Sequence, residues 1–158
     1  MKIPRPELVQ EMILKNGVAV MRFYGSSMNP FIKEGCRVVV EAVQNQPVAI
    51  GDIVCFRSDS RLVAHRVVSK LRSNGIEHIL TKGDNCSKLD APVTPGEIVG
   101  RIVRVEGRSL TGRRQRAINF CLAKLSWASN IAAQSGNKLK RAVLFKLRRL
   151  VSFIFHFF

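Results

Sequence analysis

Residues 51–68 read GDIVCFRSDSRLVAHRVV and contain two apolar runs of strand length. Asp59-Ser60 separates Ile53–Arg57 from Leu62–Val68, and Gly51-Asp52 precedes the first run. Gly, Asp and Ser favour turns, whereas β-branched and aromatic residues favour strands. The segment therefore predicts two short strands joined by a turn.

Further strand candidates lie on both sides of this segment, each next to a turn signal. In chain order they are Val18–Tyr24, Arg37–Val43, Ile76–Thr81 and Glu97–Glu106. Gly100 interrupts the last of them and suggests a β-bulge. Pro6–Lys15 instead predicts a short helix, because Pro6 suits a first helical turn and Asn16-Gly17 can end it. This pattern predicts a compact, mainly β domain with a short N-terminal helix.

Charge divides the chain of 158 residues, whose formal net charge is +15. Residues 1–100 hold 13 Lys/Arg and 10 Asp/Glu, whereas residues 101–158 hold 13 Lys/Arg and the single acid Glu106. We therefore expect a near-neutral β domain at 1–108 and a basic helical extension at 109–158. Ser135-Gly136-Asn137 should break the extension into two helices.

Composition also bears on compartment and membrane insertion. No window reaches the ~20 apolar residues that a spanning helix needs, and the N-terminal residues show no secretory signal. The cysteines are scattered without CxxC pairs, which favours reduced thiols. They are Cys36, Cys55, Cys86 and Cys121.

Ser27 lies in a turn of small residues, Gly25-Ser26-Ser27-Met28-Asn29-Pro30, directly after an apolar strand. A serine hydroxyl becomes an effective nucleophile only beside a base and donors for an oxyanion. Small neighbours let the backbone approach a substrate here. An ordinary serine in a strand-to-loop turn has the same local pattern.

His65 is the best candidate for the base. Strand alternation places it on the same face as Val63 and Val67, which should look inward. Neutral imidazole can act there as a general base, although a hydrogen-bonded core histidine is the alternative. Asp84 and Asp90 follow in a polar loop, and a carboxylate could orient the imidazole or form an Asx turn. The spacing fits no standard zinc pattern, so we expect no metal and no cofactor.

Taken in order, these segments resemble the motifs of type I signal peptidases and the related repressor-cleavage peptidases. The first is similar to the family motif Gly-x-Ser-Met-x-Pro. The others are Gly35, Gly51-Asp52-Ile53-Val54, Ala64-His65-Arg66-Val67-Val68, Thr81-Lys82-Gly83-Asp84-Asn85 and Asp90. The resemblance covers roughly residues 18–106. It implies a compact β peptidase domain that cleaves leader or precursor peptides.

The resemblance also implies roles for individual residues. His65 stands where the common bacterial enzymes carry lysine, so the chain is similar to the serine–histidine branch. Ser27 would be the nucleophile, His65 the general acid and base, Asp90 its orienting partner and Asp84 a second carboxylate of the site. Backbone N–H groups, including that of Ser27, would hold the oxyanion. The neighbours expected to contact substrate or oxyanion are Gly25, Ser26 and Met28.

Two other functions stay open. A catalytically inactive, membrane-associated pseudo-peptidase or scaffold is suggested by Gly25, where many members carry a hydroxyl residue, and by Cys36, where an aspartate is usual. A repressor-like self-cleaving regulator would need a DNA-binding module, and only 24 residues precede the serine motif.

The end of the chain mixes cations with large apolar residues at 138–150 and adds aromatic residues at 152–158. We expect an in-plane helix on an anionic membrane surface, cytoplasmic by default. A helix packed on the β domain is one alternative. Nucleic-acid binding is another, which no recognised motif supports. The residues expected to contact the membrane are Lys138, Lys140, Arg141, Lys146, Arg148, Arg149, Phe153 and Phe155.

Overall fold

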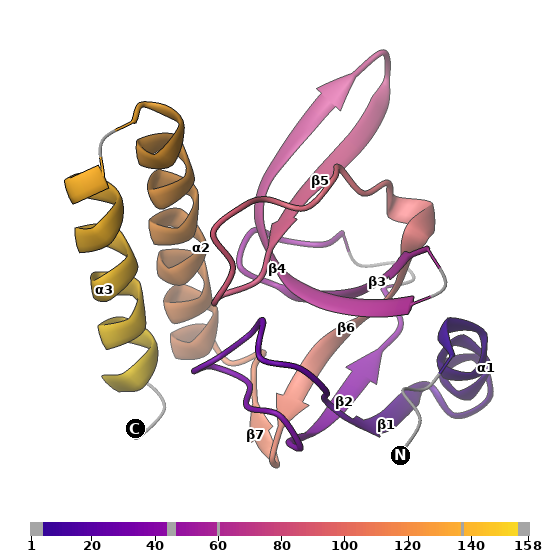
Figure 1. The fold of residues 1–158 in the computed structure, drawn as a ribbon. Helices are drawn as coiled ribbons and strands as arrows, with labels where there is room; N and C mark the ends of the chain where they lie inside the picture. Colours follow the sequence, from indigo (N-terminus) through magenta and orange to yellow (C-terminus); the bar gives the residue numbers. More distant parts are fainter. Residues whose placement is uncertain (1–4, 44–46, 60, 137, 155–158) are drawn as a thin grey trace.

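The structure is a computed structural model that describes residues 5–43, 47–59, 61–136 and 138–154. Within these residues, seven strands form one antiparallel sheet, which confirms the mainly β fold class (Figure 1). The strands are β1 (Val18–Arg22), β2 (Arg37–Glu41), β3 (Ile53–Ser58), β4 (Arg61–Ser73), β5 (Ile76–Lys82), β6 (Ile98–Val105) and β7 (Arg108–Ser109). The helices are α1 (Pro6–Asn16), the 3-10 helix η1 (Pro95–Glu97), α2 (Arg113–Gln134) and α3 (Lys138–Ile154).

The strand order is β1-β2-β6-β3-β4-β5, with β7 paired to β6. Strand β4 is 13 residues long, longer than the sequence predicted, because it serves two partners in turn. Its first part, from Arg61 to Arg66, pairs with β3. Its second part, from Arg66 to Ser73, pairs with β5. In the described residues, 61–65 therefore have a strand partner on one side only.

Gly100 allows two strands to approach each other closely. A Cβ at this position would lie 2.6 Å from Val40 Cγ1 and 2.7 Å from the Glu41 carbonyl oxygen. Gly100 itself pairs with Cys55, and the pairing of β6 with β3 then skips Val99. The irregularity suggested by the sequence thus falls on the residue beside the glycine.

Helix α1, which the sequence predicted as a short helix over Pro6–Lys15, closes one side of the main core. Val9 and Ile13 are buried against the sheet. The helix ends at Gly17, whose φ of 75° is in the left-handed region that glycine adopts readily. The Gly17 N–H donates to the Ile13 carbonyl oxygen (2.8 Å).

Helix α2 packs directly on the sheet. Ile118 and Leu122 belong to the main hydrophobic core. Ala123 packs with Val68 of β4 and Leu80 of β5. Helix α3 lies alongside α2, away from the strands (Figure 1). The first helix of the basic extension is therefore part of the same packed structure as the β domain.

The cysteine thiols and the lengths of the helices bear on two of the sequence predictions. The four cysteines, all among the described residues, form no disulfide with one another. Complete burial raises the pKa of the Cys55 thiol to about 12. None of the described helices combines the length and apolar character needed to cross a bilayer.

Candidate active site

Ser27 and His65 line the same cavity. It has a volume of about 250 Å³ and lies between residues 21–24, at the end of β1, and residues 62–65 of β4. Its wall is largely apolar, with Met21, Phe23 and Leu62 contributing. The two residues that the sequence proposed as nucleophile and base are thus brought together at one hollow of the surface.

His65 is buried and held by a carboxylate, as predicted from the resemblance. Its Nδ1 lies 2.6 Å from Oδ2 of Asp90. The Thr81 hydroxyl donates to the same carboxylate oxygen (2.7 Å), and the Asp90 N–H donates to the Thr81 carbonyl oxygen (3.0 Å). The edge of the Phe56 ring packs near the imidazole, with ring centroids 6.2 Å apart. A proton on Nδ1 satisfies this arrangement and leaves Nε2 as an acceptor.

Gly83 is the point at which the serine turn and the histidine meet. A Cβ on Gly83 would lie 2.8 Å from the Ser27 carbonyl oxygen, 2.9 Å from His65 Nε2 and 2.6 Å from Cys86 Sγ. The Asn85 N–H donates to the Ser27 carbonyl oxygen (2.6 Å). The absence of a side chain at Gly83 therefore lets Nε2 face the serine turn.

The serine turn is anchored in the core through Met28, whereas Gly25 and Ser26 are exposed to solvent. The Met28 side chain is fully buried in the main core, so it does not line the cavity. Gly25 and Ser26 are exposed, and Gly25 has a φ of 97°. In the described part of the chain, the Ser27 N–H donates to no backbone carbonyl. That N–H can therefore serve a bound group.

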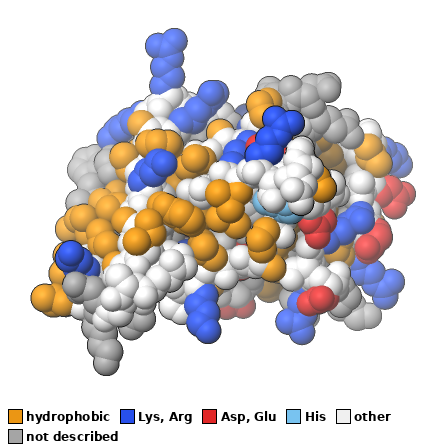
Figure 2. All heavy atoms as spheres, turned by 90° about the horizontal axis from the view of Figure 1, so that it is seen from above, with side chains coloured by type: hydrophobic (Ala, Val, Ile, Leu, Met, Phe, Trp, Pro, Cys, Tyr) orange, Lys and Arg blue, Asp and Glu red, His pale blue; other side chains and the backbone are white. Residues whose placement is uncertain are grey.

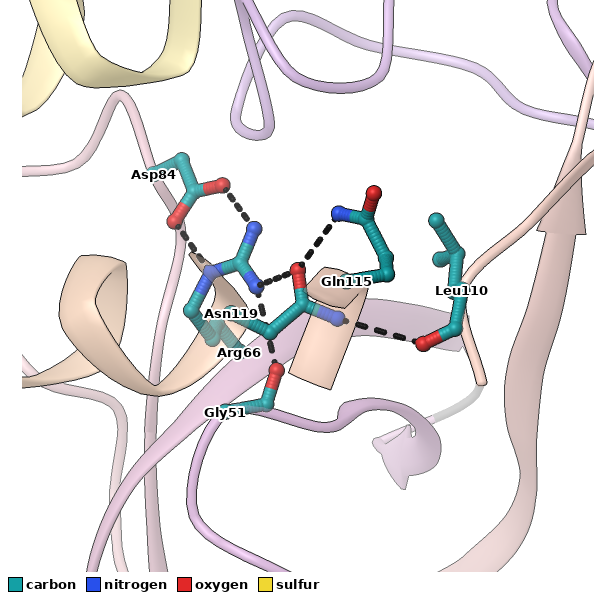
Figure 3. Close-up of polar contacts among 6 residues, drawn as sticks. All are labelled: Gly51, Arg66, Asp84, Leu110, Gln115 and Asn119. Carbon is teal, nitrogen blue, oxygen red and sulfur yellow. Dashed lines mark hydrogen bonds and ion pairs between the residues drawn. The ribbon is translucent and has the colours of Figure 1, made fainter. Parts of the chain in front are cut away.

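Asp84 contacts arginine in this structure. Its carboxylate accepts two hydrogen bonds from Arg66, from Nε (2.9 Å) and Nη2 (2.7 Å), and both side chains are almost completely buried (Figure 3). The Arg66 guanidinium also lies 4.5 Å from the centroid of the Phe31 ring. Arg66 directly follows His65, and Asp84 directly follows Gly83. The ion pair thus joins the middle of β4 to the loop that follows β5.

Helix α2 completes the surroundings of this ion pair. Arg66 Nη1 donates to the Gly51 carbonyl oxygen (3.0 Å) and to Oδ1 of Asn119 (3.2 Å), as Figure 3 shows. A Cβ on Gly51 would lie 2.8 Å from the Asn119 carbonyl carbon. Glycine at position 51 thus lets the helix backbone rest directly on the turn.

Lys82 forms a second polar link to α2. Its buried ammonium donates to the Ser126 carbonyl oxygen (3.3 Å) and to the Ser129 hydroxyl (3.1 Å). Sequence reasoning missed the roles of Lys82, Asn119 and Thr81. Strand alternation could have placed Thr81 on the face opposite Lys82. No neighbouring residue in the sequence identifies Asp90 as the hydrogen-bond partner of Thr81.

The residues predicted to contact a membrane are only partly described. Lys140 and Lys146 are exposed on α3. The side chains of Lys138, Arg141, Arg148, Arg149 and Phe153, and the whole of Phe155, lie outside the described part of the chain.

Comparison with known proteins adds no assignment to this geometry. No family model matches the chain, and no curated protein matches it significantly. Among the described residues, no three His, Cys, Asp or Glu side chains are grouped so that they could hold a metal ion.

Proposed function

We propose that the protein is a serine endopeptidase of the signal-peptidase type, with Ser27 as nucleophile and His65 as general base. The observation that carries the proposal is that His65, whose Nδ1 lies 2.6 Å from Asp90 Oδ2, lines the same cavity as Ser27. A buried histidine oriented by a carboxylate, with a serine on the same surface hollow, is one of the arrangements that catalyse acyl transfer.

The proposed reaction begins with proton transfer from the Ser27 hydroxyl to Nε2 of His65. Asp90 accepts the Nδ1 hydrogen bond, so it keeps Nε2 unprotonated beforehand and stabilises the imidazolium that forms. The Ser27 oxygen attacks the peptide carbonyl, and the Ser27 N–H stabilises the oxyanion. His65 then protonates the leaving amine, and water hydrolyses the acyl-enzyme.

The sheet offers a binding mode for the substrate. Residues 61–65 of β4 pair with β3 on one side in the described structure, and residues 62–65 border the cavity. An extended peptide can add to such a strand edge through main-chain hydrogen bonds. By resemblance to the family, the substrate would be a leader or precursor peptide with small residues before the cleaved bond.

Asp84 takes a supporting role in this mechanism. Because its carboxylate is bound by Arg66, it fixes the loop that carries Gly83. The site is thus a Ser27–His65–Asp90 arrangement supported by a separate buried ion pair.

The test is cleavage of a peptide library by the full chain, with the products identified by mass spectrometry. We expect wild type to cut after small residues, and Ser27→Ala and His65→Ala to lose at least about a thousandfold in kcat/KM. Ser73→Ala and His78→Ala are matched controls away from the cavity and should cleave like wild type. Equal cleavage by Ser27→Ala and wild type would refute the proposal. No cleavage by any protein, under conditions in which a known peptidase cuts the library, would favour the pseudo-peptidase alternative.

A further inference from the structure

Helix α3 carries an apolar surface that the fold leaves uncovered. Leu139, Val143, Leu147 and Leu150 are 75%, 55%, 42% and 54% exposed, respectively. Their spacing of four, four and three residues places them along one side of the helix, and we call them the α3 ridge. From the first to the last Cα, this ridge is about 17 Å long.

Packing within the molecule uses other residues of α3. Leu144 and Phe145 are partly buried, and Val151 packs against the main core. The helix therefore needs no apolar residues along its exposed side in order to fold. Exposed leucines in such a row mark a surface that contacts something else.

The charge of the same helix narrows the choice of partner. Residues 138–154 contain six Lys/Arg and no acidic residue. Lys140 and Lys146, next to ridge residues in the sequence, are exposed. Figure 2 shows hydrophobic side chains gathered at the side where α2 and α3 lie in Figure 1, with Lys and Arg side chains around them.

We infer that the α3 ridge docks in the plane of an anionic lipid bilayer, with its apolar side chains in the acyl boundary and its cations at the headgroups. A bilayer of this kind satisfies both features at once. Docking of a second copy through the ridge would bring two cationic helices together, which is electrostatically unfavourable. Nucleic-acid phosphates would attract the cations but leave the leucines without a partner. The inference is independent of the chemistry proposed for Ser27.

Co-sedimentation of the full chain with vesicles tests this inference. The vesicles are phosphatidylcholine alone, or phosphatidylcholine with about 30% phosphatidylglycerol as the anionic lipid. We expect binding to the anionic vesicles that weakens with added salt and is at least about tenfold weaker without the anionic lipid. Binding that is equal for the two vesicle types would overturn the assigned partner.

A double variant addresses the ridge itself. Val143→Ser/Leu147→Ser should weaken binding to the anionic vesicles by about tenfold or more. Leu71→Ser/Ile76→Ser removes two side chains of similar exposure (52% and 54%) from the β4–β5 hairpin and should bind within about twofold of wild type. Circular dichroism and thermal melts should show that both variants keep the wild-type fold.

Three further outcomes decide the matter. Unchanged vesicle binding by the folded ridge variant would refute the inference. The inference would also be refuted if wild type formed a dimer, the ridge variant did not, and wild type failed to bind vesicles. Ser27→Ala should bind vesicles like wild type, so the failure of the peptidase proposal and the failure of membrane docking give different results.

Discussion

Asp84→Ala should destabilise the protein strongly, because it removes one partner of a buried ion pair. The exposed fractions of the two side chains are 0% for Arg66 and 3% for Asp84, and both carboxylate oxygens accept a hydrogen bond from the guanidinium. Among the described residues, the variant leaves the buried Arg66 guanidinium with two neutral acceptors, the carbonyl of Gly51 and the amide of Asn119. An uncompensated buried charge of this kind costs about 3–5 kcal/mol. That is a large share of the ~5–15 kcal/mol by which a domain is usually stable.

Urea denaturation measures this loss. With an m value of about 2 kcal/mol/M, the midpoint should fall by about 2 M. Arg66→Met/Asp84→Leu should recover most of the loss, because an apolar pair of similar volume does not have to be desolvated as ions. Glu77→Ala is the matched control, since it breaks the partly exposed ion pair with Lys70 (3.0 Å) and should cost no more than about 1 kcal/mol. A loss for Asp84→Ala as small as that of the control would contradict the structural role assigned to this carboxylate.

Three further predictions concern the site and the thiols. Gly83→Ala should abolish peptide cleavage and destabilise the fold by about 1–3 kcal/mol, because its Cβ would overlap atoms of the serine turn and the histidine ring. A wild-type kcat in this variant would contradict the close approach of the serine turn and His65 at Gly83. Thr81→Val should lower kcat about tenfold with KM unchanged, since Asp90 loses a hydrogen bond, and Thr81→Ser should restore it; equal kcat in the two variants would show that the hydroxyl does not position Asp90. In the native protein at pH 8, a maleimide should label the exposed Cys121 but not Cys55, whose buried thiol stays protonated below about pH 12; mass spectrometry of the labelled peptides checks this, and labelling of Cys55 without unfolding would be inconsistent with its burial.

Local sequence patterns were sufficient for most of the fold and for part of the site. Alternating apolar residues and turn residues predicted the strands, and the inward direction of His65 followed from its neighbours Val63 and Val67. The end of β4 at Ser73 was missed, because residues 71–73 are exposed and carry no apolar alternation. They are in a strand because β5 pairs with them after a tight turn.

The contacts around the site were harder to predict, because they join residues far apart in the chain. The hydrogen bond between Arg66 and Asn119 spans 53 positions, and that between Lys82 and Ser129 spans 47. A polar residue in a basic helix gives no sign of its burial against a distant strand. For the same reason, nothing in the sequence indicated that Arg66 would bind the carboxylate of Asp84.

The contacts between α2 and the strands have a mechanical consequence. Asn119 holds Arg66, the residue after His65, and Ser129 holds Lys82, the residue before Gly83. A movement of α2 against the strands would therefore disturb the residues next to His65 and Gly83. If α3 rests on a bilayer and Ser27 cleaves peptides as proposed, the cleavage point stands at a fixed height above the lipid. The number of residues between a peptide bond and the membrane would then help to decide where the substrate is cut.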